Sequence, residues 1–97
     1  ENPLTQVSDN NFALLATYPV GEFNEHFGTQ LPEEEFDTIG GFVFGLFARI
    51  PRSGEAIAYE NLKFMVEKMK GARILNLHLT VIYSVTNGNK EDVEEKK

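Results

Sequence analysis

Apolar residues recur in two different patterns along the first part of the chain, and these patterns predict a strand followed by a helix. Residues 12–17 form a short apolar run that is typical of a buried strand. Further along, Val20, Phe23 and Phe27 recur every three to four positions, which places them on one side of a helix. Gly28 can end this helix, because glycine readily adopts the left-handed conformation of a C-cap.

A second helix is predicted from about Asp37 or Thr38 to Arg49, in the longest apolar stretch of the chain. Either of the first two residues can act as the N-cap, and Pro51 stops the helix. Spacings of three and four place six apolar residues on one stripe, which we expect to face the core. These residues are Ile39, Phe42, Val43, Leu46, Phe47 and Ile50.

The opposite side of the second helix is flat, because most of its residues are small. An interior glycine costs roughly 0.5–1 kcal/mol relative to alanine, so we expect another backbone to lie close to this helix. That backbone can belong to the same domain or to a partner, since small residues let helices approach closely in both cases. The candidate interaction face consists of Gly41, Phe44, Gly45 and Ala48.

Alternation of apolar and polar residues predicts three strands after the second helix. The first covers residues 56–59, and a turn at residues 60–61 leads to the second, over residues 62–66. Gly71 turns the chain again before the third strand, over residues 75–81. The sequence therefore predicts an α+β fold in which two helices pack on a mainly antiparallel sheet of about four strands. The expected order is strand, helix, helix, strand, strand, strand.

The two ends of the chain lack this periodicity. Residues 1–10 are polar and are predicted to be a linker, while residues 84–97 contain Gly, Asn and mixed charges and are predicted to be a disordered acidic and polar tail. The folded domain is expected over residues 11–83, in line with one domain for 97 residues. No stretch reaches the roughly 18 apolar residues that cross a membrane, so we expect no direct membrane insertion.

Charge is distributed unevenly and narrows the range of partners. Residues 1–48 contain eight acidic residues and no Lys or Arg, within a total net charge of −6. Such a surface repels phosphate backbones, so nucleic acid is not an expected partner. The chain has no cysteine, which excludes disulfides, thiolate metal sites and thiol nucleophiles.

No set of side chains in the sequence forms a recognisable catalytic group, so we expect neither an enzyme nor a cofactor, and no cofactor-binding residue is assigned. His26 and His78 have no further ligand at zinc spacing. An acidic cluster could hold a divalent cation through carboxylate oxygens. We favour the interpretation that these acids complement the dipole of the helix that follows, and we predict no metal site. The cluster consists of Glu33, Glu34, Glu35 and Asp37.

Several segments, spread over residues 12–82, resemble the CorC/HlyC transporter-associated domain. The combination of Asp-Thr-Ile-Gly-Gly with Arg-Ile-Pro and Gly-Glu downstream is specific, and it is most similar to the domain at the C-terminus of CorC-type magnesium and cobalt efflux proteins, which are also called hemolysin-related. The segments that carry the resemblance are 22–28, 31–41, 49–51, 54–55, 64–66 and 73–74.

The resemblance implies helices packed on a sheet, in a domain that follows a pair of CBS domains and often an N-terminal membrane domain. It implies a regulatory role in divalent-cation efflux, in which the domain modulates transport without performing it. The expected partners are the neighbouring CBS domains or a second copy in a homodimer. The expected location is the cytoplasm, or the cytoplasmic side of the inner membrane through the parent protein. An alternative function, suggested by the fold relationship alone, is the sensing of an adenine nucleotide or a flavin.

Overall fold

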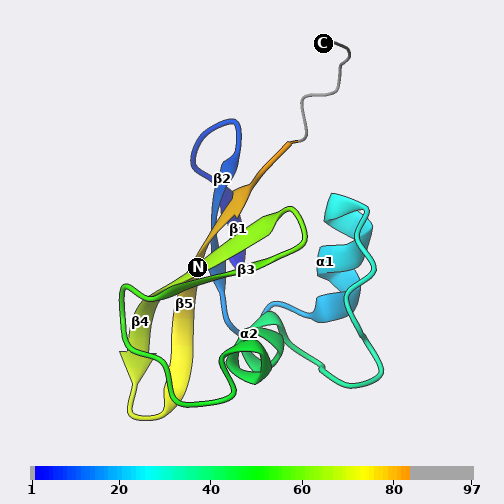
Figure 1. The fold of residues 1–97 in the computed structure, drawn as a ribbon. Helices are drawn as coiled ribbons and strands as arrows, with labels where there is room; N and C mark the ends of the chain where they lie inside the picture. The colour runs from blue at the N-terminus through cyan, green and yellow to red at the C-terminus, as the bar shows by residue number, and fades with distance from the viewer. Residues whose placement is uncertain (1, 84–97) are drawn as a thin grey trace, which may run out of the picture.

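The computed structural model describes residues 2–83 and shows an antiparallel five-stranded sheet on which two helices pack (Figure 1). The strands lie side by side in the order β1-β2-β5-β4-β3. The α+β class and the order of the predicted elements are confirmed. The elements are β1 (Leu4–Gln6), β2 (Asn11–Leu15), α1 (Val20–Phe27), α2 (Ile39–Phe47), β3 (Ala56–Tyr59), β4 (Leu62–Lys70) and β5 (Arg73–Val81).

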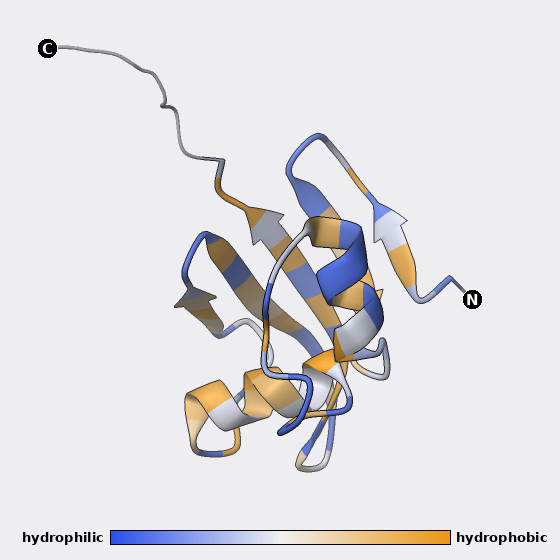
Figure 2. Cartoon of the chain, turned by 90° about the vertical axis from the view of Figure 1, so that its right-hand side faces the viewer, coloured by the Kyte–Doolittle hydropathy of each residue, from blue (hydrophilic) through white to orange (hydrophobic). Residues whose placement is uncertain are grey.

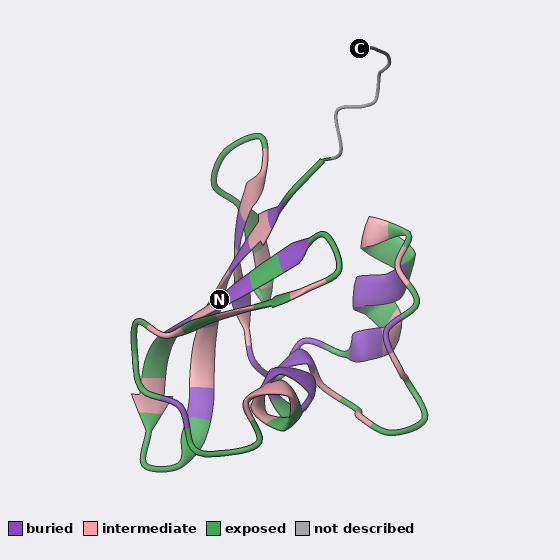
Figure 3. Ribbon diagram, viewed as in Figure 1, coloured by how far each residue is buried: buried purple, intermediate pink, exposed green. Residues whose placement is uncertain are grey.

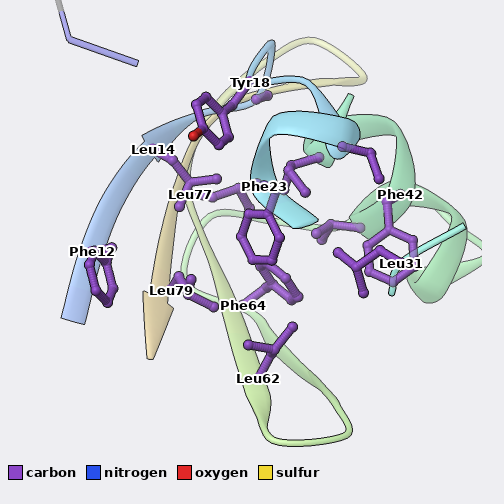
Figure 4. Close-up of a cluster of buried hydrophobic side chains, with 14 of the residues drawn as sticks. Phe12, Leu14, Tyr18, Phe23, Leu31, Phe42, Leu62, Phe64, Leu77 and Leu79 are labelled. Carbon is purple, nitrogen blue, oxygen red and sulfur yellow. The ribbon is translucent and has the colours of Figure 1, made fainter. Parts of the chain in front are cut away.

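The core lies between the helices and one face of the sheet, and strand register decides which side chains reach it. Phe12 pairs with Leu79, and Leu79 pairs in turn with Phe64, so that all three side chains point to the same face. Phe64 and Leu79 are completely buried there, as is Phe23 from α1 (Figure 4). The alternation over residues 62–66 of β4 and 77–81 of β5 thus gives the sheet one apolar face and one open face, as Figure 3 shows by burial.

The C-terminus of α1 and the N-terminus of α2 lie at residues suited to those positions. Gly28 ends α1 with φ 67°, as predicted. Thr38 caps α2, because its hydroxyl oxygen accepts a hydrogen bond from the Gly41 N–H at 3.2 Å. The helix ends at Phe47, and Ala48 adopts a left-handed conformation with φ 58°. The second helix is therefore shorter at its C-terminus than the sequence suggested.

The sheet has five strands, and the additional strand lies inside the segment that we expected to be a linker. β1 pairs antiparallel with β2, with Leu4 opposite Leu14 and Gln6 opposite Phe12. At three residues β1 is too short to show a hydrophobic repeat, and its pairing depends on an exposed edge of β2 that the local sequence does not reveal. The expectation of a disordered tail over residues 84–97 falls outside the described residues.

The expected core stripe of α2 reaches only part of the way along the helix. Its first half is buried, but Leu46 and Phe47 are half-buried and Ile50 is 56% exposed. The left-handed turn at Ala48 explains this, because the helical repeat stops there and Ile50 no longer follows the stripe. In the sheet, a register shift between Val66 and Lys68 likewise interrupts the regular alternation of buried and exposed side chains.

Candidate functional site

The α2 helix is the most unusual element of the fold, because none of its nine residues has a polar side chain. A helix that is apolar on all sides is normally enclosed by other elements. Here α2 lies at one end of the molecule, and Figure 2 shows it as a largely orange, hydrophobic helix with paler bands. Phe44, Leu46 and Phe47 are only half-buried. Part of this apolar surface therefore faces solvent.

One glycine of α2 meets the close backbone approach that the sequence predicts. A Cβ on Gly40 would lie 2.5 Å from Ala16 Cβ and 3.0 Å from the carbonyl oxygen of Ala16. The Gly40 N–H donates a hydrogen bond to that same oxygen at 2.8 Å. Gly40 thus holds the first turn of α2 against the end of β2, which is an intramolecular contact.

We call the predicted interaction face the α2 face; it consists of Gly41, Phe44, Gly45 and Ala48. The ring of Phe36, whose position the sequence did not reveal, covers part of this face. The ring of Phe36 lies over Gly45, with its Cζ atom 2.9 Å from the position of an added Cβ. Gly41, Gly45 and Ala48 are nevertheless exposed, and Phe44 is half-buried. Gly45 therefore serves internal packing, while the rest of the α2 face remains accessible.

An open pocket of about 300 Å³ lies beside α2. It forms where the end of β2, the first turns of α2 and the β4–β5 turn meet, and we call it the Arg73 pocket. The α2 face contributes two of its residues to this pocket. Its lining includes Thr17, Thr38, Gly41, Phe44, Ala72 and Arg73.

The acidic cluster does not decorate a helix. Glu33, Glu34 and Glu35 lie in an exposed turn, and the first turn of α2 contains no acidic residue, since the helix begins only at Ile39. The interpretation that the cluster complements a helix dipole is therefore wrong. Asp37 is exposed and precedes the N-cap. Within residues 2–83, no group of three or more His, Cys, Asp or Glu side chains could hold a metal ion.

A buried polar residue that sequence reasoning missed holds the connection between the helices. Asn24 is 8% exposed, and its Oδ1 accepts hydrogen bonds from the Leu31 N–H at 2.9 Å and the Thr29 hydroxyl at 2.8 Å. Its Nδ2 donates to the Leu31 carbonyl oxygen at 3.0 Å and to Glu33 Oε2 at 2.9 Å. An asparagine in an amphipathic helix gives no signal of this role, because its partners lie in a loop.

The Arg-Ile-Pro and Gly-Glu motifs are joined by an ion pair in the loop after α2. Arg49 and Glu55 form a two-pronged ion pair, and Glu55 Oε2 also accepts a hydrogen bond from the Arg52 N–H at 2.9 Å. Gly54 supports the tight turn with φ 95°. The hydrogen bond to Arg49, followed by that from the Arg52 backbone, lowers the pKa of the Glu55 carboxyl, and the same contact raises the pKa of Arg49. These motifs are structural.

The two histidines lie on different elements and are not brought together. His78 is on the open face of the sheet, where its Nε2 lies 2.8 Å from Asn11 Oδ1 and its Nδ1 lies 3.6 Å from Glu67 Oε2. His26 is exposed near the end of α1. Within residues 2–83, neither helix is long and apolar enough to span a membrane.

Comparison with known proteins assigns this fold to one family. The sequence model of CorC_HlyC, described as a transporter associated domain, matches residues 5–82. The magnesium and cobalt efflux protein CorC of Pasteurella multocida is 37% identical over 78 residues, which cover 80% of this chain and 26% of that protein. CorC of Escherichia coli K12 is 36% identical over 76 residues, which cover 78% of this chain and 26% of that protein. The chain thus spans about a quarter of the length of these relatives.

Solved structures agree with the sequence relationship. The CorC-associated region of a Mg²⁺ and Co²⁺ transporter from Neisseria meningitidis has a TM-score of 0.79 at 30% identity, and a hemolysin domain from Enterococcus faecalis has 0.77 at 33%. A CorC_HlyC domain of a Xylella fastidiosa hemolysin, solved in complex with Mg²⁺ and Mn²⁺, has 0.74 at 26%. Each alignment covers 84% of this chain and all of the other chain. The chain therefore belongs to the CorC_HlyC family of transporter-associated domains.

Proposed function

We propose that this chain is a non-enzymatic accessory domain of a CorC-type divalent-cation efflux protein, and that it modulates transport by docking through α2 on the neighbouring CBS domains. The observation that carries the proposal is that α2 has no polar side chain, yet presents an accessible face. Exposed apolar surface of this kind marks interaction sites in soluble domains. A partner that covers the α2 face would bury this exposed apolar surface, which favours binding there.

The size of the relatives supports a partner within the same protein. The curated relatives are magnesium and cobalt efflux proteins about four times as long as the segment that this chain matches. One solved domain with the same fold, 17% identical and with a TM-score of 0.73, comes from a CBS domain protein of Porphyromonas gingivalis and is aligned over its full length. In our proposal, the remainder of the parent protein supplies the surface that covers α2 on the cytoplasmic side of the inner membrane.

The chemistry of the described residues supports an accessory role over a catalytic one. The residues that the family motif singles out serve structure: Thr38 caps α2, Gly40 packs on β2, and Arg49 pairs with Glu55. The exposed charges of the α1–α2 loop form no metal-binding group within residues 2–83. We therefore propose that the domain acts by docking. Docking would shift the parent protein between two arrangements, and this shift would alter transport.

The proposal is tested by replacing an apolar residue of the α2 face with a charged one. Phe44→Glu places a carboxylate on this face, and Ile50→Glu does so at a neighbouring residue that is 56% exposed and contributes little to folding. Gly45→Leu is a poor probe, because the leucine would collide with Phe36. The matched control is Val7→Glu, at an exposed apolar residue between β1 and β2. The connection between these two strands lies at the opposite end of the sheet from α2 (Figure 1).

Binding of each variant to the remainder of the parent protein is measured by calorimetry, and its oligomeric state by light scattering. We expect Phe44→Glu and Ile50→Glu to weaken binding at least tenfold and Val7→Glu to leave it unchanged. Equal binding by all four proteins would refute docking through α2. Loss of a homodimer without loss of binding to the parent protein would instead assign the α2 face to self-association.

A further inference from the structure

The Arg73 pocket lies directly beside the α2 face. Phe44 lines both, so that a partner covering the α2 face also reaches the pocket. The β4–β5 turn forms one wall, with Gly71 at φ 60° and the small Ala72 next to it. Ile74 is 7% exposed and provides an apolar floor.

The side chain of Ile74 reaches this floor because of the register shift in the β4–β5 hairpin. The regular pairing of Val66 with Leu77 gives way to Lys68 opposite Asn76, and then to Met69 opposite Ile74. A bulge of this kind redirects side chains near a strand end. As a result Ile74 is buried while Leu75 is half-buried, against the alternation expected from the sequence.

The charge at the pocket is opposite to that of the molecule. The protein has a net charge of −6, but among residues 2–83 Arg73 is the one charged residue that lines the pocket. Lys70 lies opposite Arg73 in the strand register, so the same turn carries a second positive charge. Within residues 2–83, the guanidinium of Arg73 forms no ion pair. This positive charge is available to a partner.

The polar groups of the pocket add hydrogen-bond donors. The Thr38 hydroxyl oxygen accepts the capping hydrogen bond from Gly41, which leaves its proton free to be donated. Thr17 is exposed and contributes a second hydroxyl to the lining. Donors around one arginine, above an apolar floor, suit a carboxylate, because arginine binds carboxylates in a two-pronged geometry.

We propose that the Arg73 pocket receives an acidic side chain from the domain that docks on α2, with apolar contact to Phe44 beside it. This inference rests on the proposed docking function and specifies its partner: a surface segment of the parent protein that carries an Asp or Glu next to an apolar residue. The apolar contact supplies the buried area, and the arginine fixes which segment docks and in which orientation.

The test compares Arg73→Glu, Arg73→Lys and a control in binding to the remainder of the parent protein, measured by calorimetry at 50 and 300 mM NaCl. The control is Lys63→Glu, which makes the same change in net charge on the open face of the sheet, where Lys63 is exposed and pairs with Thr80. We expect Arg73→Glu to weaken binding about tenfold or more at 50 mM NaCl, and to reduce the salt dependence. Arg73→Lys keeps the positive charge but loses the two-pronged geometry, so it should weaken binding by less than Arg73→Glu does, while Lys63→Glu should stay within about twofold of the unmodified domain.

The outcomes separate this inference from the function on which it rests. If Phe44→Glu weakens binding and Arg73→Glu does not, docking stands and the acidic-group recognition is overturned. If the unmodified domain does not bind the remainder of the parent protein, the proposed function itself fails. Heat released on titration of the isolated domain with an adenine nucleotide or a flavin, abolished by Arg73→Glu, would assign the pocket to a small ligand and overturn the inference.

Discussion

Gly40 and Gly41 are neighbours in one helix but differ in the space around them, and this difference gives a paired prediction. Gly40→Ala places a Cβ 2.5 Å from Ala16 Cβ and should lower the free energy of unfolding by about 1–3 kcal/mol. At Gly41 the nearest atom to an added Cβ is Thr38 Oγ1 at 3.4 Å, so Gly41→Ala should leave stability unchanged or raise it by up to about 1 kcal/mol through helix propensity.

Urea unfolding followed by circular dichroism measures both variants. Equal effects of Gly40→Ala and Gly41→Ala would show that α2 does not pack on the end of β2 as closely as described.

Asn24 is the residue whose loss should most affect the connection between the helices. Asn24→Ala leaves the N–H and the carbonyl oxygen of Leu31 without their hydrogen-bond partners, and Leu31 is buried. We expect the free energy of unfolding to fall by about 2–4 kcal/mol, because each unsatisfied buried polar group costs about 1–3 kcal/mol. Gln30→Ala, an exposed change in the same loop, is the control and should stay within about 0.5 kcal/mol. Similar results for the two variants in chemical denaturation would contradict the role of Asn24.

In the loop after α2, the ion pair of Glu55 makes a contribution to folding stability that depends on pH. Because the pKa of Glu55 is lowered in the folded protein, the folded state binds fewer protons at this carboxyl than the unfolded state does. Its contribution to stability is therefore complete above the ordinary pKa of 4.5 and is lost as the pH falls through the lowered value.

Glu55→Gln should remove this contribution. The difference in unfolding free energy between the unmodified protein and Glu55→Gln is expected to be larger at pH 7 than at pH 3, and to shrink as salt is added at pH 7. Thermal unfolding over this pH range measures it, with the exposed Glu25→Gln as control. A difference that does not change with pH would show that the ion pair with Arg49 does not form in solution.

The sequence was sufficient for features that depend on neighbouring residues, and insufficient for those that depend on distant ones. The cap at Gly28, the cap at Thr38 as one of two candidates, and the alternation in β4 follow from local chemistry and were predicted. The strand β1, the ring of Phe36 over Gly45 and the hydrogen bonds of Asn24 join segments that only the fold brings together. These were missed for that reason.

The candidate site was predicted in part for the same physical reason. Helical spacing grouped Gly41 with Phe44, and both line the pocket, but it could not show the β4–β5 turn that lines the same pocket. Arg73 therefore entered the sequence analysis only as part of the family resemblance, and nothing in the sequence indicated that it lines a pocket. Conversely, the acidic residues 33–35 appeared to belong to a helix, because Pro32 and three acids are typical of a helix start.

The molecule combines a one-sided sheet, two helices that complete its core, and one helix whose outer side is apolar without being covered. Its curated relatives are about four times longer than the matched segment, which leaves ample protein to provide a covering surface. An accessory domain of this kind acts through the equilibrium between docked and undocked arrangements, so its effect on transport depends on how tightly α2 is held.

Amide hydrogen exchange of α2, measured in the isolated chain and in the intact parent protein, reports whether another part of that protein covers the helix. Docking through α2 predicts that the amides of residues 44–48 exchange at least about tenfold more slowly in the intact protein, while those of residues 8–10 in the β1–β2 turn exchange equally in both. Equal exchange at residues 44–48 in the two samples would show that α2 is not the docking surface.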